Sequence, residues 1–471
     1  MSPQNTSRPK ARLPRGFRDR PAADIAAERR MLETIRQVYE SYGFEPLETP
    51  AFEYTDALGK FLPDLDRPNE GVFSLKDDDG QWLSLRYDLT APLARYVAEN
   101  FQHLPKPFRR YQVGQVWRNE KPGPGRYREF TQFDADTVGS ASPAADAELL
   151  MMTCDALEAL GLKRGEYIVK MNSRRLLDAV LQSASVSDLQ RGTVLRAIDK
   201  YDRLGEAGVR ALLGKGRKDE SGDFTTGAGL DEKQIALVME LLTATAERYD
   251  TIAAVQELQT IRTTLAANGY DENRVQIDTS IIRGLEYYTG PVFEAQLQFP
   301  VTNEAGETIV FGSVAGGGRY DDLVARFTGQ QVPATGISIG VSRLLSAVKQ
   351  RSEAPLAPLA VVLTMDDAAQ SFAMARELRE AGLRAEAYVG TKKFGDQLKY
   401  ADKRGAAIAV IEGADERASG KVTLKDLKRG AELSKAVESR AEWLSERQAQ
   451  VTVERARLVQ EVKALLTRGR W

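Results

Sequence analysis

The 471-residue chain has almost no cysteine or histidine. Cys154 is its only cysteine and His103 its only histidine. A single cysteine excludes an intramolecular disulfide and a zinc site built from several cysteines. A single histidine excludes a cluster of histidine metal ligands and argues against a catalytic triad with a histidine base. Any chemistry must therefore rest on arginine, carboxylate, glutamine and tyrosine side chains.

Long apolar runs and a strong net charge are also absent. No apolar stretch is long enough to span a bilayer, so we expect no membrane segment. The polar segment Met1 to Arg12 has no apolar signal core, and we expect a cytoplasmic protein. Basic and acidic residues nearly balance, 65 against 67, so the charge of the whole chain does not indicate a nucleic-acid partner.

Local charge is less even than the total. Residues 101–130 carry seven Lys and Arg against two Glu, and residues 391–430 carry ten against six acidic residues. Two basic regions far apart in sequence fit contact with a polyanion at two places. The alternative for each region is an ordinary solvated charged surface.

Strand and helix patterns divide the chain into blocks. Strand-like stretches and charged loops fill much of residues 1–171, whereas helical periodicity dominates residues 172–274. Strand character resumes in residues 275–350, so we expect the helical block to be inserted into a sheet-based domain. A proline-flanked linker, residues 351–358, precedes alternating strands and helices in residues 359–471, which predict an α/β domain.

The segment Trp117 to Gln132 predicts a hairpin whose arms carry charge. Arg118 and Glu120 precede a Pro/Gly loop, and Arg126 and Phe130 follow it. Guanidinium groups can fix a phosphoryl oxygen by bidentate hydrogen bonds and neutralise charge that grows during reaction. The alternatives are a solvated face for the arginines and core packing for Phe130.

The segment Arg283 to Gly290 concentrates a guanidinium, a carboxylate and two adjacent phenols between two glycines. The phenols belong to Tyr287 and Tyr288. A cation beside two aromatic hydroxyls suits a small ligand that has a carboxylate or phosphate and a polar ring. Taken alone, such a short string is more often a strand edge followed by a turn.

Together these segments resemble histidyl-tRNA synthetases, a family of class II aminoacyl-tRNA synthetases. Arg283 to Gly290 resembles their histidine-binding signature, and Trp117 to Gln132 resembles motif 2. Further segments resemble parts of these enzymes in the family's order. Leu13 to Gly16 resembles the N-terminal segment, Phe44 to Pro50 resembles motif 1, and Arg86 to Thr90 resembles the ammonium-binding segment. Ala315 to Asp321 resembles a second histidine signature, Pro333 to Leu345 resembles motif 3, and Lys399 to Gly405 resembles the anticodon-binding domain. The resemblance covers nearly the whole chain.

The resemblance implies an α/β fold with an α+β catalytic domain, in which helices flank an antiparallel sheet. Residues 1–171 and 275–350 would be its two parts, residues 172–274 a helical insertion, and residues 359–471 an α/β anticodon-binding domain. It also implies a homodimer, because motif 1 lies at the dimer interface in this family.

The implied activity is ATP-dependent attachment of L-histidine to tRNA(His) through a histidyl-adenylate. Mg²⁺ is expected with ATP, but its ligands cannot be read from the spacing of residues. Two positions depart from the family pattern: Ser342 precedes the motif 3 arginine where an acid is usual, and Glu286 replaces the commoner aspartate. Neither change removes a residue to which we assign chemistry.

The resemblance also assigns site residues. The catalytic arginines, placed at the α-phosphate, are Arg118 and Arg283. The expected ATP-binding residues are Arg118, Glu120, Arg126, Phe130 and Arg343. The expected histidine-binding residues are Asp88, Thr90, Arg118, Gln132, Asp136, Arg283, Tyr287 and Tyr288.

Two alternatives of other kinds stay open on sequence alone. A non-catalytic paralogue, such as the regulatory subunit of ATP phosphoribosyltransferase, would lack the anticodon-binding domain and parts of the signatures. A class II synthetase for another amino acid is disfavoured by Asp136 with Tyr288, since an acceptor plus a phenol suits a ring with two nitrogens.

The motif 2 loop, Pro122 to Gly125, offers no side-chain hydrogen-bond donors. A loop without donors reads base edges poorly. We therefore expect charging to depend little on an extra 5′ guanosine of the tRNA, unless Arg126 and Arg128 compensate.

Overall fold

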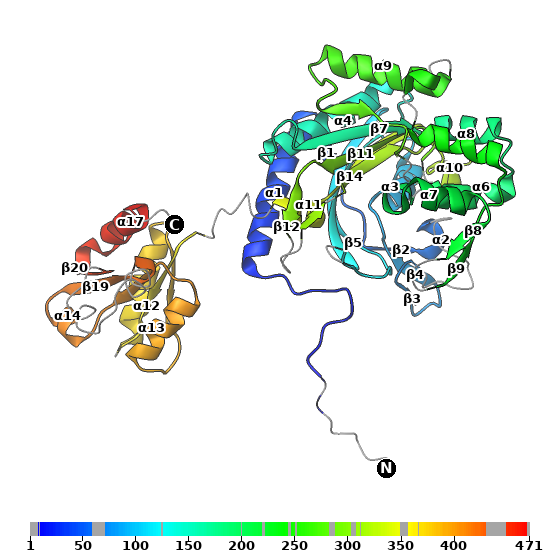
Figure 1. The fold of residues 1–471 in the computed structure, drawn as a ribbon. Coiled ribbons are helices and arrows are strands. Elements are labelled where there is room, and N and C mark those ends of the chain that lie inside the picture. Colours follow the sequence, from blue (N-terminus) through cyan, green and yellow to red (C-terminus); the bar gives the residue numbers. More distant parts are fainter. Residues whose placement is uncertain are drawn as a thin grey trace. The chain divides into compact units, whose positions relative to one another are not determined.

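The computed structural model divides the chain into two compact units, Met1–Ser352 and Glu353–Trp471 (Figure 1). The structure describes residues 8, 10–58, 71–123, 126–198, 200–218, 222–243, 246–249, 252–281, 288–302, 308–310, 312–348, 357–365, 367–429 and 449–468. Among these residues, no helix is both long and apolar enough to cross a membrane. Each unit is described by itself.

A central sheet organises the first unit. Its described strands follow the order β1-β5-β6-β15-β14-β11-β7-β10. In that order they are Glu45–Pro46, Phe108–Trp117, Glu129–Val138, Ala334–Gly340, Ser313–Arg319, Pro291–Leu297, Tyr167–Ser173 and Val275–Ile277. The pairs from β5 to β7 are antiparallel, and only the two edge strands pair in parallel. The predicted antiparallel sheet is therefore confirmed, although the motif 1 segment forms only a two-residue strand.

Four helices pack against this sheet and close its main core (Figure 1). They are α1 (Ala22–Ser41), α4 (Pro143–Ala159), α9 (Ala253–Ala267) and α11 (Val341–Val348). Apolar residues of the helices, such as Ile35 and Leu149, meet Phe133 and Ile337 from the strands, and all four side chains are buried. Because side chains alternate along a strand, the residues next to Phe133 and Ile337 in the chain face the opposite side of the sheet. That opposite face carries polar residues.

Smaller elements complete the polar side of the sheet. A three-stranded sheet has the order β2-β4-β3, formed by Phe52–Tyr54, Trp82–Leu85 and Ser74–Lys76. Helix α3 (Thr90–Asn100) lies beside it and shares a small core with Tyr320 and Leu323. Short elements of this unit are α2 (Thr55–Leu58), α10 (Ala325–Thr328), β12 (Pro300–Thr302) and β13 (Thr308–Val310).

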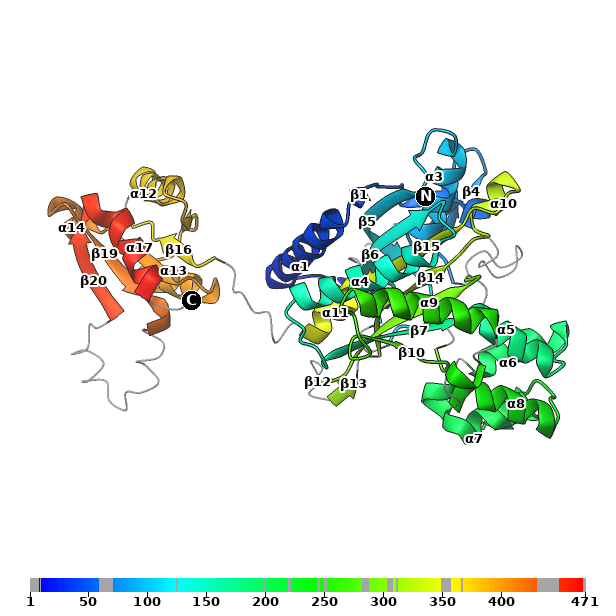
Figure 2. The same ribbon diagram turned by 90° about the horizontal axis from the view of Figure 1, so that it is seen from above.

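Helices between β7 and β10 form a group with its own core (Figure 2). They are α5 (Arg174–Ser183), α6 (Asp188–Ile198), α7 (Tyr201–Leu213) and α8 (Glu232–Thr243), followed by the 3-10 turn η1 (Ala246–Tyr249). Between α7 and α8, strand β8 (Gly216–Lys218) pairs with β9 (Phe224–Thr226). Helix α9 differs from these helices, since Leu258, Ile261 and Leu265 pack into the core of the main sheet.

The second unit is an α/β domain, as the alternating pattern predicts. Its sheet has the order β17-β16-β18-β19-β20, formed by Arg384–Ala387, Leu359–Val362, Ile408–Ile411, Lys421–Asp426 and Gln450–Glu454. The first three strands are parallel, and β19 and β20 are antiparallel. The helices are α12 (Ala368–Glu380), α13 (Phe394–Lys403), α14 (Ala414–Ala418) and α17 (Leu458–Arg468), with the turn η3 (Arg455–Arg457). Two buried clusters form its core.

Candidate active site

A pocket of about 670 Å³ opens on the polar face of the main sheet. Its walls come from β6, β14 and β15, from the hairpin of β5 and β6, and from the start of α3. The pocket brings together these predicted site residues: Asp88, Thr90, Arg118, Glu120, Arg126, Phe130, Gln132, Tyr288 and Arg343. Arg283 and Tyr287 lie outside the described residues.

Strand β6 builds the floor of the pocket. Gln132 and Asp134 line it, while Phe133 between them packs into the helix-covered core. Gly336 on β15 stands opposite Asp136, and a Cβ there would lie 2.0 Å from the Asp136 Oδ1 atom. Only glycine permits this approach of strand and carboxylate.

Asp136 does not line the pocket but lies beneath its floor. Its carboxylate pairs with the fully buried Arg110 at 2.8 Å and accepts a hydrogen bond from the Tyr320 hydroxyl. Arg110 also donates to the Leu89 carbonyl oxygen at 2.9 Å. Burial raises the pKa of Asp136, and Arg110 and Tyr320 oppose that rise. Two other side chains therefore hold this carboxylate in place.

Asp88 stands at the start of α3. Its Oδ1 atom accepts backbone hydrogen bonds from Thr90 at 3.2 Å and Ala91 at 2.9 Å. Burial raises the pKa of Asp88, while the Ala91 hydrogen bond and the charge of Arg118 lower it. The first turn of a helix favours an anion, so this carboxylate is fixed where a ligand cation can reach it.

Arg118 extends from the end of β5 into the pocket. Its Nε atom donates to the Tyr87 carbonyl oxygen at 3.1 Å, and its guanidinium carbon lies 5.2 Å from the centre of the Phe130 ring. A cation on an aromatic face is held without an acidic partner. The guanidinium is thus oriented toward the pocket without being neutralised by these two contacts.

Arg343 lies in the first turn of α11 and lines the pocket. The preceding Ser342 accepts the backbone N–H of Thr131 at 3.0 Å. Ser342 therefore ties α11 to β6 at the position where the family usually has an acid. This contact positions the helix turn that carries Arg343.

Several pocket residues received no role from the sequence, among them the polar residues Asp134, Ser338 and Tyr127. Asp134 is only 2% exposed, and burial, with a smaller contribution from the charge of Asp136, raises its pKa to about 7. A signal for Asp134 was available, because Gln132, Asp134 and Asp136 alternate with apolar residues and so share one face of a strand.

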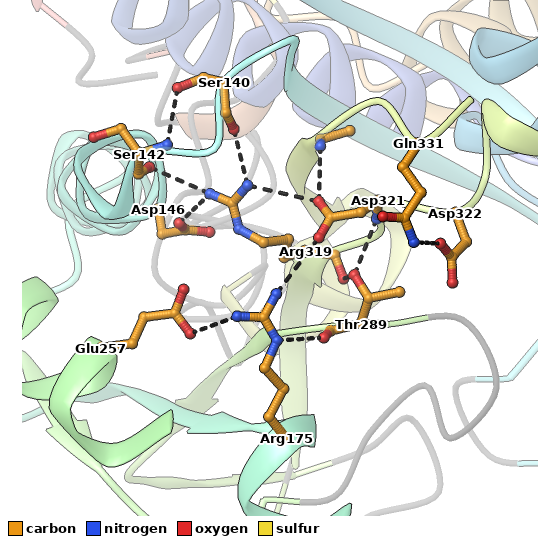
Figure 3. Close-up of polar contacts among 11 residues, drawn as sticks. Ser140, Ser142, Asp146, Arg175, Glu257, Thr289, Arg319, Asp321, Asp322 and Gln331 are labelled. Atoms are coloured by element: carbon orange, nitrogen blue, oxygen red, sulfur yellow. Dashed lines mark hydrogen bonds and ion pairs between the residues drawn. The ribbon is translucent and has the colours of Figure 1, made fainter. Parts of the chain in front are cut away.

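A polar network holds the end of β14 next to the pocket (Figure 3). Arg319 pairs with the buried Asp146 and donates to the Ser140 carbonyl oxygen at 2.8 Å. The Thr289 N–H donates to the Arg319 carbonyl oxygen at 2.7 Å, and the Asp321 N–H donates to the Thr289 hydroxyl at 3.0 Å. The network therefore fixes the residue that follows the pocket-lining Tyr288.

Arg175 of α5 joins the same network from the helical group. Its Nε atom donates to the Thr289 carbonyl oxygen at 3.1 Å, and its other nitrogens approach Glu257 at 3.4 Å and Asp321 at 3.7 Å (Figure 3). The Arg175 side chain is half exposed, so these ion pairs are worth little to stability. Their effect is on the position of Thr289.

The described residues contain no group of three or more His, Cys, Asp or Glu residues that could hold a metal ion. Acidic residues do approach the pocket singly, as Asp88 and Glu120. A Mg²⁺ ion that arrives with ATP keeps most of its ligands from phosphate oxygens and water, so it needs few from the protein. The donor set of this pocket fits such an ion.

Comparison with solved structures defines the class of fold. A crystal structure of histidyl-tRNA synthetase from Nostoc sp. PCC 7120 superimposes with a TM-score of 0.70 and is 30% identical, covering 97% of this chain and 100% of that one. The fold is thus that of the class II aminoacyl-tRNA synthetases.

Sequence comparison gives the family. The family model for histidyl-tRNA synthetase matches residues 16–344, and a model for an anticodon binding domain matches residues 359–465. A histidine–tRNA ligase of Rhizobium meliloti (strain 1021) is 58% identical over 98% of this chain and 97% of that protein. One of Rhizobium leguminosarum bv. trifolii (strain WSM2304) is 57% identical, with 97% and 95% covered. The chain belongs to the histidyl-tRNA synthetase family.

Proposed function

We propose that the chain attaches L-histidine to tRNA(His) in two ATP-dependent steps. The observation that carries the proposal is the division of charge within one pocket. Arg118, Arg126 and Arg343 bring positive charge, and Asp88 and Asp134 bring carboxylates. Such a pocket suits two substrates together, a polyphosphate on the basic side and an ammonium group on the acidic side.

In the first step, the histidine carboxylate attacks the α-phosphorus of ATP and pyrophosphate leaves. Arg118 would bind the α-phosphate, with Arg283 on the other side of it, and Arg126 and Arg343 would hold the β- and γ-phosphates. Glu120 and Phe130 would receive the adenine. Positioning and neutralisation of charge are what such a transfer requires. Mg²⁺ bound with ATP would neutralise further phosphate charge.

In the second step, the 3′-terminal ribose hydroxyl of tRNA attacks the carbonyl carbon of the adenylate and AMP leaves. Neither step uses a protein side chain as a nucleophile. This agrees with a pocket in which no described lining residue is a cysteine, histidine or lysine.

Histidine would lie between the start of α3 and the floor of the pocket. Asp88, Thr90 and Gln132 would accept and orient its ammonium group. Asp136, Tyr287 and Tyr288 would recognise the imidazole. The Tyr320 hydroxyl would keep Asp136 in place, as its hydrogen bond to that carboxylate indicates.

The remaining roles follow the division of the chain. Residues 359–471 would bind the anticodon, residues 172–274 would be an insertion in the catalytic domain, and residues 44–50 would lie at the interface of a homodimer. The enzyme would act in the cytoplasm. The match of residues 359–465 to an anticodon binding domain supports the first of these roles.

Histidine-dependent exchange between ATP and pyrophosphate tests the proposed activity. We expect exchange with histidine and not with the other nineteen amino acids. Arg118→Ala should reduce it by about 10²–10³-fold, because one preorganised charged donor is lost. Arg262→Ala is a matched control, since Arg262 is an exposed residue of α9 that pairs with Glu272 away from the pocket. Wild-type protein without exchange would support the regulatory paralogue instead.

Truncation tests the role of the second unit. A chain ending after residue 350 should keep part of its adenylate synthesis, because the pocket lies wholly in the first unit. It should lose discrimination between tRNA(His) transcripts with native and altered anticodons. Unchanged discrimination in the truncated protein would refute the assignment.

A further inference from the structure

Two buried oxygen atoms on the pocket floor lack hydrogen-bond partners among the described residues. They are Gln132 Oε1 and Asp134 Oδ1, and both side chains are more than nine-tenths buried. An unsatisfied buried acceptor costs about 1–3 kcal/mol. Both residues line the pocket, so a ligand with several donors could satisfy the two acceptors at once.

A short relay fixes the direction of the Gln132 amide. The Gln132 Nε2 atom donates to Ser338 Oγ at 2.7 Å, so the serine hydroxyl accepts there. Asp134 stands directly opposite Ser338 in the register of β15 against β6, and hydrogen bonding by Ser338 lowers the pKa of the Asp134 carboxyl, so the hydroxyl proton is directed there. If the amide were reversed, Gln132 would offer an acceptor to a hydroxyl whose proton is committed to Asp134. The relay therefore keeps Gln132 Oε1 as the acceptor presented to the pocket.

We propose that Asp134 is a binding residue for the α-ammonium group of the amino-acid substrate, acting beside Asp88 and, through Ser338, holding the Gln132 carbonyl toward that group. This inference rests on the proposed function and adds one residue to the proposed amino-acid-binding site. An ammonium group has three N–H donors, which matches the two carboxylates and the amide oxygen.

The charges that surround Asp134 make its binding role dependent on pH. The groups that face it are Asp136 on its own strand, Arg110 on β5, Asp88 before α3 and Arg86 of the preceding loop, with Tyr39 of α1 and Tyr320 nearby. Burial is the largest cause of the raised pKa, followed by the charge of Asp136. Because this pKa is about 7 without ligand, the ammonium group competes with a proton.

The first test is Asp134→Asn, which keeps the shape and removes the charge. At pH 8 we expect the KM for histidine to rise about 10–100-fold, the range for loss of one charged hydrogen bond. The KM for ATP should stay within about twofold. At pH 6 the ratio of the two proteins' KM values for histidine should shrink severalfold, because wild-type Asp134 is then mostly protonated. The imidazole of the substrate titrates identically in both measurements.

Thr137→Val is the matched control. Thr137 is a buried residue of the same strand, but it alternates to the face away from Gln132 and Asp134. It should leave both KM values and their pH dependence unchanged. Ser338→Ala should raise the KM for histidine by a smaller factor, about 2–10-fold, because a neutral hydrogen bond is lost.

Two competitive inhibitors of the exchange reaction locate the contact on the substrate. Histidinol keeps the ammonium group and lacks the carboxylate, so Asp134→Asn should weaken its inhibition constant about as much as the KM for histidine. 3-(Imidazol-4-yl)propionate lacks the ammonium group and should inhibit both proteins equally. Loss of inhibition by the propionate alone would place Asp134 at the imidazole and overturn the proposal.

Two further results would also overturn it. One is a KM for histidine that Asp134→Asn leaves unchanged at pH 8 in an otherwise active enzyme. The other is an equal rise in both KM values together with a lower stability, which would indicate a purely structural role. Failure of the proposed function is distinct from both, because the wild-type protein itself would then show no histidine-dependent exchange.

Discussion

Asp134→Asn should stabilise the protein above neutral pH even though it weakens binding. The ordinary pKa of this carboxyl is 3.8, and in the folded protein it is raised to about 7. A raised carboxyl pKa contributes stability that is fully present below 3.8 and is lost as the pH rises through 7. At pH 8 the folded protein therefore carries the whole cost of an ionised, buried Asp134. The shift of about three pKa units corresponds to about 4 kcal/mol.

Asparagine recovers only part of that energy. Its carbonyl oxygen can stand beside Ser338 as a carboxylate oxygen does, but its amide places N–H donors where the carboxylate had an acceptor. An unpaired buried amide costs about 1–3 kcal/mol. The expected net gain is therefore about 1–3 kcal/mol at pH 8. Near pH 5 the wild-type group is already neutral, so the gain should vanish or become a small loss.

Urea unfolding at pH 8 and pH 5.5 measures this difference. Because the chain has two compact units, a single transition cannot be assumed. Trp82 and Trp117 report on the first unit if Trp443 and Trp471 of the second unit are replaced by phenylalanine in both proteins. A variant less stable than the wild-type protein at pH 8, or a difference that is equal at the two pH values, would refute the reasoning.

Three other predictions concern residues that support the pocket and the charging of tRNA. Asp146→Asn should destabilise the first unit by about 3–5 kcal/mol, measured by the same urea unfolding, because it removes the close anionic partner of the buried Arg319 and leaves only the longer pair with Asp321 at 3.7 Å. Gly336→Ala should cost about 1–3 kcal/mol by overpacking and should also raise the KM for histidine, since its Cβ would displace Asp136. Charging of two transcripts that differ only in an extra 5′ guanosine should differ by less than about 100-fold, or 2.7 kcal/mol; a larger loss would show that the motif 2 loop reads that base.

Much of the fold was predictable because its signals are local. The strands of the motif 2 hairpin alternate charged or polar residues with apolar ones, and a Pro/Gly loop joins them. The structure has strands at Phe108–Trp117 and Glu129–Val138, in the predicted antiparallel pairing. The α/β pattern of the second unit is local in the same sense. The prediction for the motif 1 segment was less accurate, because only Glu45–Pro46 pairs with β5, and proline cannot donate a hydrogen bond to a strand ladder.

The deeper part of the site depends on contacts between distant segments. Asp136 was expected at the imidazole, but its partners Arg110 and Tyr320 come from two other strands or strand ends. Arg319 and Asp146 are 173 residues apart. No periodicity within a single segment specifies which buried carboxylate meets which arginine. The Arg110–Asp136 pairing follows from the register of β5 against β6, which only the folded sheet fixes.

The pocket floor holds more carboxylates than its stability alone would favour. Asp134 and Asp136 are buried and Asp88 is partly buried, and the pKa of each is raised, with loss of solvent as the first cause. Arg110 compensates Asp136 through a direct ion pair, and backbone N–H groups compensate Asp88. The charge of Arg110 and the Ser338 hydroxyl lower the pKa of Asp134 by less than burial and the charge of Asp136 raise it. A buried charge that the fold leaves uncompensated lowers stability, and such sites are expected where a ligand supplies the missing charge. The ammonium group of the amino acid supplies it here, so binding should both stabilise the first unit and release a proton near neutral pH.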